Sequence, residues 1–510
     1  MQRKLGAILS YINVIVQNGV YLLYTPFLIH FLGQKQFGIY QLSSQIVSAL
    51  GMLALGFSGA YVRFYWIEKR KSELHLSRLN GLYLLIFCCS ALAAISAGII
   101  LMNNPQAIFN TNYSDGEVNA VSQMLMIMSI NVGINFISSV FNSYILACEK
   151  FIFQQSRVFV STLMQPVVII TLLALGFGVV YVATVQLIFS IGIMLLNIRY
   201  AIKSLHMLFS FGKGQVKLLK SISIFSGYIL INQIVDFINN SVPGLIIGKV
   251  LDPVSVAIYA IAIQIRTVFY QLSVALSSVF VPKMNELVMG RDNDGLNYYL
   301  IRVGRIQYTL LTFILGGFIV LGKEFLHIWV GEGFELSYWI IISMVLPVII
   351  PLSQNLGIEI QRAKNLHRFR SVVMAIFAVM NVLLTYLAVL NWGVIASGVG
   401  YIVGIAFANI IAVNIYNQKV VGLNMIAFWQ NIIRISYVPI ITTFGVLVFK
   451  SMVSFQGVSG IIYIGIAYTT MFSVLSYLFS LNDLEKKYIN ELVYKILYFR
   501  KRTTFNDDNY

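Results

Sequence analysis

Long apolar stretches alternate with short polar segments along the whole of the 510-residue chain. A helix needs about 20 apolar residues to cross the hydrocarbon core of a bilayer, and these stretches reach roughly that length. They predict fourteen membrane-spanning helices, over residues 6–31, 39–62, 81–102, 119–143, 158–176, 179–199, 221–247, 255–281, 304–322, 337–359, 371–390, 394–416, 432–449 and 457–480. Since only Gly176–Gly178 separates the fifth stretch from the sixth, counts of twelve and thirteen spans stay open.

The composition assigns the chain to a class. Hydrophobic residues make up 58% of it and charged residues only 11%. An ordinary globular domain has about 45–50% apolar and about 25% charged residues. A soluble fold of this composition would have too few charged groups to cover its surface. Pattern and composition together predict an all-α integral membrane protein that crosses the bilayer many times.

The positive charges lie almost entirely on one side of the predicted membrane. The chain holds 35 Lys and Arg residues against 19 Asp and Glu residues, a formal net charge of +16. With the N-terminus inside, the outer loops contain only Lys35, Lys249, Lys323 and Lys450, and Arg266 lies within a span. Lys and Arg concentrate in cytoplasmic loops. The excess therefore reports topology rather than nucleic-acid binding, and both termini are predicted to be cytoplasmic.

The segments outside the membrane are too short to fold as separate domains. The longest outer loop runs from about Asn103 to Val118, and no inner loop is much longer. The sequence has neither a Walker-type phosphate loop nor a His-Glu-x-x-His motif. Its three cysteines lie in or at the end of apolar stretches and form no disulfide framework. This organisation favours a transporter without a bound metal or nucleotide over a receptor or an enzyme.

The second half of the chain is similar to the first. Ile39–Ile46 aligns with Ile258–Ile265 at an offset of 219 residues, with four identities in eight, and Asn13 falls on Asn232. Six helices separate the two copies, so they cross the membrane in the same direction, as parallel transporter repeats do. We therefore predict an N-lobe over 1–202, a basic cytoplasmic linker over 203–220, a C-lobe over 221–418, two appended helices over 419–481 and a cytoplasmic tail over 482–510.

Several short segments resemble one family of transporters. Pro26–Gly33, Phe37–Tyr40 and Gly56–Ala60 with Arg63 are similar to the first two helices of the Wzx-type flippases. These are the polysaccharide and O-antigen members of the multidrug/oligosaccharidyl-lipid/polysaccharide (MOP) exporter superfamily. Similar segments of the second half are Phe280–Pro282, Trp329–Gly331, Asn381–Val382 and Trp392–Gly393. The resemblance extends over nearly the whole chain.

The resemblance implies a fold, a function and partners. Members of that family have a MATE-like arrangement of two six-helix lobes around a central cavity that opens alternately to each side. They move undecaprenyl-diphosphate-linked oligosaccharides, such as O-antigen, capsule or exopolysaccharide units, to the outer leaflet of the bacterial inner membrane. The implied partners are the lipid-linked oligosaccharide, membrane lipids, the polysaccharide polymerase and glycosyltransferases. The resemblance also favours Arg63 and Arg305 at the entrance of the cavity.

Polar side chains within the predicted spans recur at helical spacing. Asn232, Asp236 and Asn240 are four residues apart, so they lie on one face of their helix. An unpaired polar group is costly in lipid, and such a face suits the wall of a polar cavity. Hydrogen bonds between packed helices are the alternative. The amide candidates for the cavity wall are Asn13, Gln17, Asn232, Asn240 and Gln264.

Asp236 and Arg266 are the two ionisable residues deep inside the predicted spans. A charged side chain at the centre of a membrane helix costs roughly 2.5–3.5 kcal/mol on insertion scales, so such residues are seldom kept without a use. Both are equally far from the turn near Leu251, and we expect them to pair across adjacent helices. Either the pair is structural, or Arg266 attracts a diphosphate while Asp236 holds it in place or exchanges a proton.

Glu359, near the inner end of its span, is a second candidate for ion coupling beside Asp236. The membrane potential contributes about 2.3 kcal/mol per charge and 100 mV. Export of a diphosphate from a negative cytoplasm could therefore be driven by the potential alone. Proton or sodium coupling stays an option, and no cofactor is expected.

Two other functions remain open. An ion-coupled multidrug exporter would share the fold, although such exporters usually have twelve helices. A membrane-embedded polysaccharide polymerase or ligase would act on the same lipid, but such enzymes generally need a large outer loop with catalytic groups. The acidic residues of the outer loops are Asp115, Glu117, Glu324, Glu332 and Glu335, and no acid–base pair is recognisable among them. The sequence thus favours a flippase that is not an enzyme.

Overall fold

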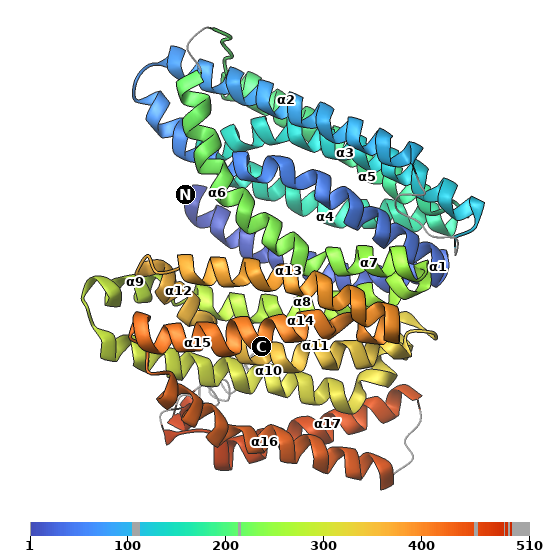
Figure 1. Ribbon diagram of the computed structural model, residues 1–510, viewed down its shortest axis with the longest axis vertical. Helices are drawn as coiled ribbons and strands as arrows, with labels where there is room; N and C mark the ends of the chain where they lie inside the picture. The colour runs from blue at the N-terminus through green and yellow to red at the C-terminus, as the bar shows by residue number, and fades with distance from the viewer. Residues whose placement is uncertain are drawn as a thin grey trace, which may run out of the picture. The chain divides into compact units, whose positions relative to one another are not determined.

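Helices extend over all of the apolar stretches predicted to span the membrane. The computed structural model describes residues 2–104, 113–212, 216–452, 457–483, 485–487 and 490–491, and every regular element within these ranges is helical (Figure 1). The α-helices are α1 (Gln2–Lys69), α2 (Glu73–Asn103), α3 (Asp115–Ala147), α4 (Phe151–Ala174), α5 (Val179–Arg199), α6 (Val216–Asn240), α7 (Val242–Val250), α8 (Pro253–Ser278), α9 (Val281–Met289), α10 (Asn293–Val330), α11 (Glu335–Ser353), α12 (Asn355–Ala363), α13 (Arg368–Trp392), α14 (Val399–Ile405), α15 (Val413–Tyr416), α16 (Met425–Met452) and α17 (Gly457–Leu475). Shorter 3-10 or π-helical turns are η2 (Tyr200–Ser204), η3 (Val394–Gly398), η4 (Ala406–Ala412), η5 (Asn417–Val421) and η6 (Ser476–Ser480).

Twelve helices of the described ranges are long and apolar enough to cross a membrane. One of them, over Ile12–Lys69, contains two of the predicted spans. Helix α6, which covers most of the predicted span 221–247, is not among the twelve. The all-helical membrane architecture is therefore confirmed, whereas the number of fourteen spans stays a prediction.

Helix α1 reverses direction at a single glycine. Gly33 has φ 74° and ψ 164°, a conformation that glycine adopts readily because it has no Cβ. Before it, Asn13 lies against the start of α4, and just after it Lys35 is ion-paired with the first turn of α3. Further on, Tyr65 contacts the C-terminal end of α3. The first two predicted spans are thus the two arms of α1, and the predicted loop between them is reduced to this reversal.

The chain packs as two compact units. Unit 1 contains Met1–Val268, Trp329–Met344 and Arg370–Ala408, and unit 2 contains Phe269–Ile328, Val345–Phe369 and Asn409–Tyr510. The predicted linker, 203–220, lies wholly inside unit 1. Unit 1 thus groups α6, α7 and most of α8 with the helices of the first half, and the division into an N-lobe and a C-lobe stays a prediction.

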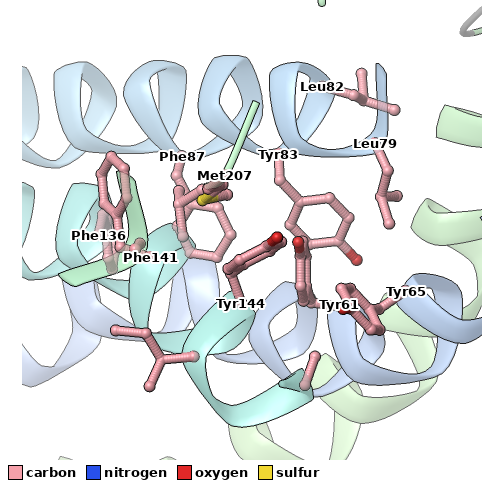
Figure 2. Packing of buried hydrophobic residues seen from close by; sticks show 14 of the residues in the cluster. Tyr61, Tyr65, Leu79, Leu82, Tyr83, Phe87, Phe136, Phe141, Tyr144 and Met207 are labelled. Atoms are coloured by element: carbon pink, nitrogen blue, oxygen red, sulfur yellow. The ribbon is translucent and has the colours of Figure 1, made fainter. Parts of the chain in front are cut away.

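The core of unit 1 is rich in aromatic residues from α1, α2 and α3. Figure 2 shows Tyr61, Tyr83 and Tyr144 in this core together with Phe87. Tyr61 and Tyr83 meet edge to face, with ring centroids 4.8 Å apart, a favourable geometry for aromatic pairs. The Tyr61 hydroxyl donates a hydrogen bond to Asn80 Oδ1 at 2.5 Å. The Tyr61 phenol is thereby satisfied within an apolar core, whereas the Tyr83 hydroxyl is buried without a hydrogen-bond partner.

The start of the predicted linker is bound to this same core. Asn80 Nδ2 donates to the Leu208 carbonyl at 2.8 Å, and Ser210 N–H donates to the Ser77 carbonyl at 2.9 Å. Met207 is buried in the aromatic core (Figure 2). The connection that leaves η2 is therefore fixed to α2 before the chain enters α6.

Two apolar clusters lie within the described residues of unit 2, and α16 contributes to both. The first joins α9, α10, α12 and α16, with Leu300, Leu356 and Phe428 among its most buried members. The second joins α10, α16 and α17 around Tyr468, whose hydroxyl donates to the Phe313 carbonyl at 2.8 Å. The appended C-terminal helices of the sequence prediction are thus packed onto α10.

The capping of α2 and α10 repeats within the fold. The Ser72 side chain accepts a hydrogen bond from His75 N–H at the start of α2. The Asp292 carboxylate accepts one from Gly295 N–H, at 2.8 Å, at the start of α10. The separation of the two capping residues, Ser72 and Asp292, is one residue more than the offset of 219 residues between the matched segments of the sequence. Both residue types are preferred at helix N-caps. Each of these two helices thus begins with a side-chain cap.

Candidate functional site

A buried arginine in α8 is the centre of the candidate site. Only 4% of the Arg266 surface is exposed. Its Nη2 atom donates to Asn240 Oδ1 at 2.6 Å, and its guanidinium carbon lies 4.1 Å from the centroid of the Tyr401 ring. Its Nη1 atom is buried without a hydrogen-bond partner. In the described ranges, no aspartate or glutamate pairs with this cation.

The partners of Arg266 are positioned by their own helices. Asn240 is the last residue of α6, and its Nδ2 donates to the Asp236 carbonyl one turn earlier, at 2.7 Å. This bond turns Oδ1 toward Arg266. Tyr401 lies on α14 beside Gly400, where a Cβ atom would clash with the Asn381 carbonyl of α13. The close approach of α14 and α13 thus fixes the segment that carries the aromatic face, in line with the helix-packing role that small residues have in membranes.

The expected ion pair between Asp236 and Arg266 is not formed. Asp236 is exposed on α6, and the positive charge that acts on its carboxylate is that of Arg370. The helix of the sequence prediction breaks at Ser241, since Pro243 in the first turn of α7 has no N–H to continue the helix of α6. Asn240, and not Asp236, is the residue of α6 that Arg266 contacts.

Two of the predicted cavity amides instead connect helices. Asn13 Nδ2 donates to the Gln155 carbonyl at 2.8 Å and to its Oε1 atom at 2.7 Å. Gln264 Nε2 donates to Thr25 Oγ1 at 3.0 Å. Both residues are buried, with 5% and 6% of their surface exposed. These geometries match the alternative of hydrogen bonding between packed helices.

The other predicted lining amides have different surroundings. Gln17 is exposed on α1. Asn232 belongs to α6, but its side chain lies outside the described residues. Asn239, next to Asn240, accepts a hydrogen bond from Asn381 Nδ2 of α13 at 3.1 Å. This last contact links the end of α6 to α13 at Asn239, the residue next to the Arg266 partner Asn240.

The predicted entrance residues and the second coupling candidate differ in exposure and pairing. Arg63 is exposed. Arg305 is buried and donates from Nε and Nη2 to the two carboxylate oxygens of Glu485, at 3.0 and 2.9 Å. Glu359 pairs with Arg362 at 2.8 Å, one turn along α12. The charges of Arg305 and Glu359 are thus compensated within the protein.

The sequence prediction missed a second cation that is held by neutral amides. Arg157 on α4 donates from Nη1 to Asn197 Oδ1 and from Nη2 to Asn142 Oδ1, the latter at 3.1 Å. Its Nε atom is buried without a partner. The available signal was an arginine at the start of an apolar stretch, together with Asn142 in the preceding span.

The described residues bring together no group of three or more His, Cys, Asp or Glu side chains that could hold a metal ion. The ligand chemistry of the candidate site is that of a fixed guanidinium, an amide and an aromatic ring. Such a set can bind an anion by charge and hydrogen bonds, and it offers polar and stacking contacts to a sugar. The expectation of no cofactor stays an expectation.

Comparison with solved structures defines the class of fold. The structure is similar to the lipid II flippase MurJ in an inward closed conformation, with a TM-score of 0.72 at 17% identity over 92% of this chain and 98% of that one. It is also similar to an inward-facing MATE family multidrug resistance transporter of the MOP superfamily, with a TM-score of 0.56 at 15% identity over 82% of this chain and 95% of that one. The chain therefore has the fold of a MOP-superfamily transporter.

The sequence comparison shows the family. The chain belongs to the polysaccharide biosynthesis protein family, whose model matches residues 5–288. It is also 22% identical to the uncharacterized membrane protein EpsK of Bacillus subtilis (strain 168), over 80% of this chain and 82% of EpsK. The resemblance seen in the sequence is thereby confirmed at the level of family and fold. The protein is a multi-pass integral membrane protein of polysaccharide biosynthesis.

Proposed function

We propose that this protein is a flippase that moves undecaprenyl-diphosphate-linked oligosaccharide from the cytoplasmic to the outer leaflet of the bacterial inner membrane. The oligosaccharide is a repeat unit of O-antigen, capsule or exopolysaccharide. Movement occurs by alternating access, with both termini in the cytoplasm. Family membership and the MOP fold support transport of a polysaccharide precursor.

The buried, uncompensated charge of Arg266 is the main support for the proposal. A buried charge without a counter-charge is strongly unfavourable, and the described partners of Arg266 are a neutral amide and a ring. A diphosphate supplies the missing negative charge. The planar guanidinium also matches phosphate oxygens with two parallel hydrogen bonds. The free donor at Nη1 is then used when the substrate is bound.

The polar residues around Arg266 support a role toward the glycan. Asn240 is exposed, as is Asp236 one turn earlier on α6. Both carry the hydrogen-bonding groups that sugar hydroxyls need. In this proposal Arg266 binds the diphosphate, Asn240 orients Arg266, and the exposed face of α6 contacts the first sugars. Asp236 is also the group that we propose for proton or sodium coupling, since its carboxylate is accessible.

The test uses a bacterial strain from which the gene has been deleted. The wild-type chain is expected to restore surface polysaccharide, and the deletion is expected to accumulate lipid-linked oligosaccharide on the cytoplasmic face. Arg266→Gln is expected to fail at equal protein level. Arg434→Gln is the matched control, because Arg434 is an exposed arginine of α16. Full export by Arg266→Gln, or accumulation on the outer face, would overturn the proposal.

A further inference from the structure

A cavity in unit 2 shares no residue with the site of Arg266 and its partners. It has a volume of about 500 Å³ and is formed by the connection from α9 to α10 and the connection from α12 to α13. The walls combine apolar and polar side chains, which are Val288, Leu296, Leu366, Arg291, Asn293 and Lys364. The first three are apolar, two of the others are cations, and Asn293 is an amide. None of these six residues is acidic.

Two left-handed residues shape the cavity. Arg291, after α9, has φ 54°, and Asn365, after α12, has φ 57°. At both places the following N–H donates back into the preceding helix, from Asp292 to the Leu287 carbonyl at 3.0 Å and from Leu366 to the Gln361 carbonyl at 2.8 Å. This is the geometry of a helix closed by a left-handed residue. The two connections are thereby held in defined conformations.

The cations of the cavity are not neutralised by the protein. Lys364 Nζ donates to Asn293 Oδ1 at 3.0 Å and to the Val421 carbonyl at 2.8 Å, both neutral acceptors. An ammonium has three donors, so one is left for a ligand. The nearest carboxylate in sequence, Asp292, caps α10 by accepting from Gly295 N–H. Among the described residues, neither Lys364 nor Arg291 forms an ion pair.

Burial lowers the pKa of Lys364, because desolvation disfavours the charged ammonium. An anion in the cavity would offset this penalty. The chain on either side of the cavity enters long apolar helices, α10 and α13. The cavity therefore lies at the end of membrane helices, where lipid headgroups are found.

We propose that this cavity binds a phosphoryl anion, with Arg291 and Lys364 as its ligands and the apolar walls beside it. The anion comes either from the headgroup of an acidic lipid or from free phosphate in solution. Either source would be a ligand distinct from the transported substrate. The proposal does not depend on the identity of that substrate.

The experiment measures ligand binding to the purified full-length protein. One arm titrates phosphatidylglycerol into protein in a neutral detergent, with phosphatidylcholine for comparison, and the other titrates inorganic phosphate. We expect saturable binding in at least one arm.

Arg291→Asn is expected to weaken this binding about tenfold, through loss of a charge-assisted contact. Asparagine tolerates the left-handed conformation, so this change removes the charge without straining the turn. Lys364→Gln should act in the same direction.

The controls are exposed cations of unit 2 outside the cavity. Arg434→Asn and Lys419→Gln change the net charge equally and should leave the affinity unchanged. If Lys364→Gln fails to fold, Arg291→Asn still decides the result. Binding confined to phosphatidylglycerol identifies a lipid site, and binding of inorganic phosphate identifies a soluble anion site. No saturable binding in either arm, or equal weakening by the control variants, would overturn the proposal.

Discussion

Arg266 in unit 1 and Arg305 in unit 2 are both buried arginines of long apolar helices, and their partners differ in charge. Arg266 has 4% of its surface exposed and contacts an amide and an aromatic ring. Arg305 has 7% exposed and binds the carboxylate of Glu485 through two nitrogens, with the Ser480 carbonyl as a further acceptor at 2.7 Å. One guanidinium is compensated by the protein and the other is not.

The difference separates a structural cation from a candidate binding cation. A buried ion pair with good geometry holds two segments together, here α10 and the residues after α17. A buried cation with neutral partners retains its attraction for an external anion. Both arginines looked alike in the sequence, where each was a candidate for the cavity. The charge of the partner, rather than burial, distinguishes them.

The largest expected effect is on stability, at Arg305. Arg305→Gln leaves the Glu485 carboxylate buried without a counter-charge, which typically costs about 3–5 kcal/mol. Thermal unfolding of the purified protein should therefore start at a clearly lower temperature. The double variant Arg305→Met, Glu485→Met removes both charges and should recover most of the loss. Equal stability of the single variant and the wild type would show that the pair is not structural.

At Arg266 we expect the reverse of Arg305, a large effect on export and a small effect on stability. Arg266→Gln should reduce export by tenfold or more, since a charge-assisted hydrogen bond contributes about 1.5–3 kcal/mol and about 1.4 kcal/mol is a factor of ten. Its effect on stability should be small, because loss of the contacts is offset by removal of an unpaired buried charge. Surface polysaccharide and unfolding temperature are measured on the same variant. A large destabilisation with normal export would contradict this assignment.

Variants of Tyr401 test whether its aromatic ring stabilises the charge of Arg266. Tyr401→Leu removes the ring face, and cation–π contacts are worth about 0.5–2 kcal/mol. Export should fall severalfold, while Tyr401→Phe, which keeps the ring, should stay close to wild type. Transport rates of the two variants in proteoliposomes provide the comparison. Equal rates for Leu and Phe would exclude a role for the aromatic face.

The smallest effect on stability is expected at Asp236. Because Asp236 is exposed and does not pair with Arg266, Asp236→Asn should change the free energy of unfolding by no more than about 0.5 kcal/mol. Chemical denaturation measures this difference. A loss of several kcal/mol would instead be the signature of the buried pair that the sequence suggested.

The helices could be predicted from the sequence, and the breaks between them could not. In lipid every backbone polar group must be satisfied within the chain, so a long apolar stretch has little choice but to form a helix. The reversal at Gly33 and the break at Ser241 depend on the conformation of one or two residues. Such local events leave no periodic signal.

The candidate site could be predicted only in part, for a related reason. Arg266 is found by its position inside an apolar stretch, which is a property of the local sequence. The pairing of Arg305 with Glu485 joins residues 180 positions apart, and spacing along one helix cannot reveal it. The amides Asn13 and Gln264 were candidates because they are polar side chains at helical spacing within predicted spans. Their hydrogen-bond partners, Gln155 and Thr25, are far from them in the sequence, and spacing along one helix could not reveal these contacts.

The central claim is that the charge of Arg266 is available to an anionic lipid-linked substrate. The most direct test measures the affinity of the purified protein for undecaprenyl diphosphate. Arg266→Gln should weaken binding by about tenfold or more, and the matched variant Arg434→Gln should bind like the wild type. Equal affinity of the wild type and Arg266→Gln, with both correctly folded, would contradict the account.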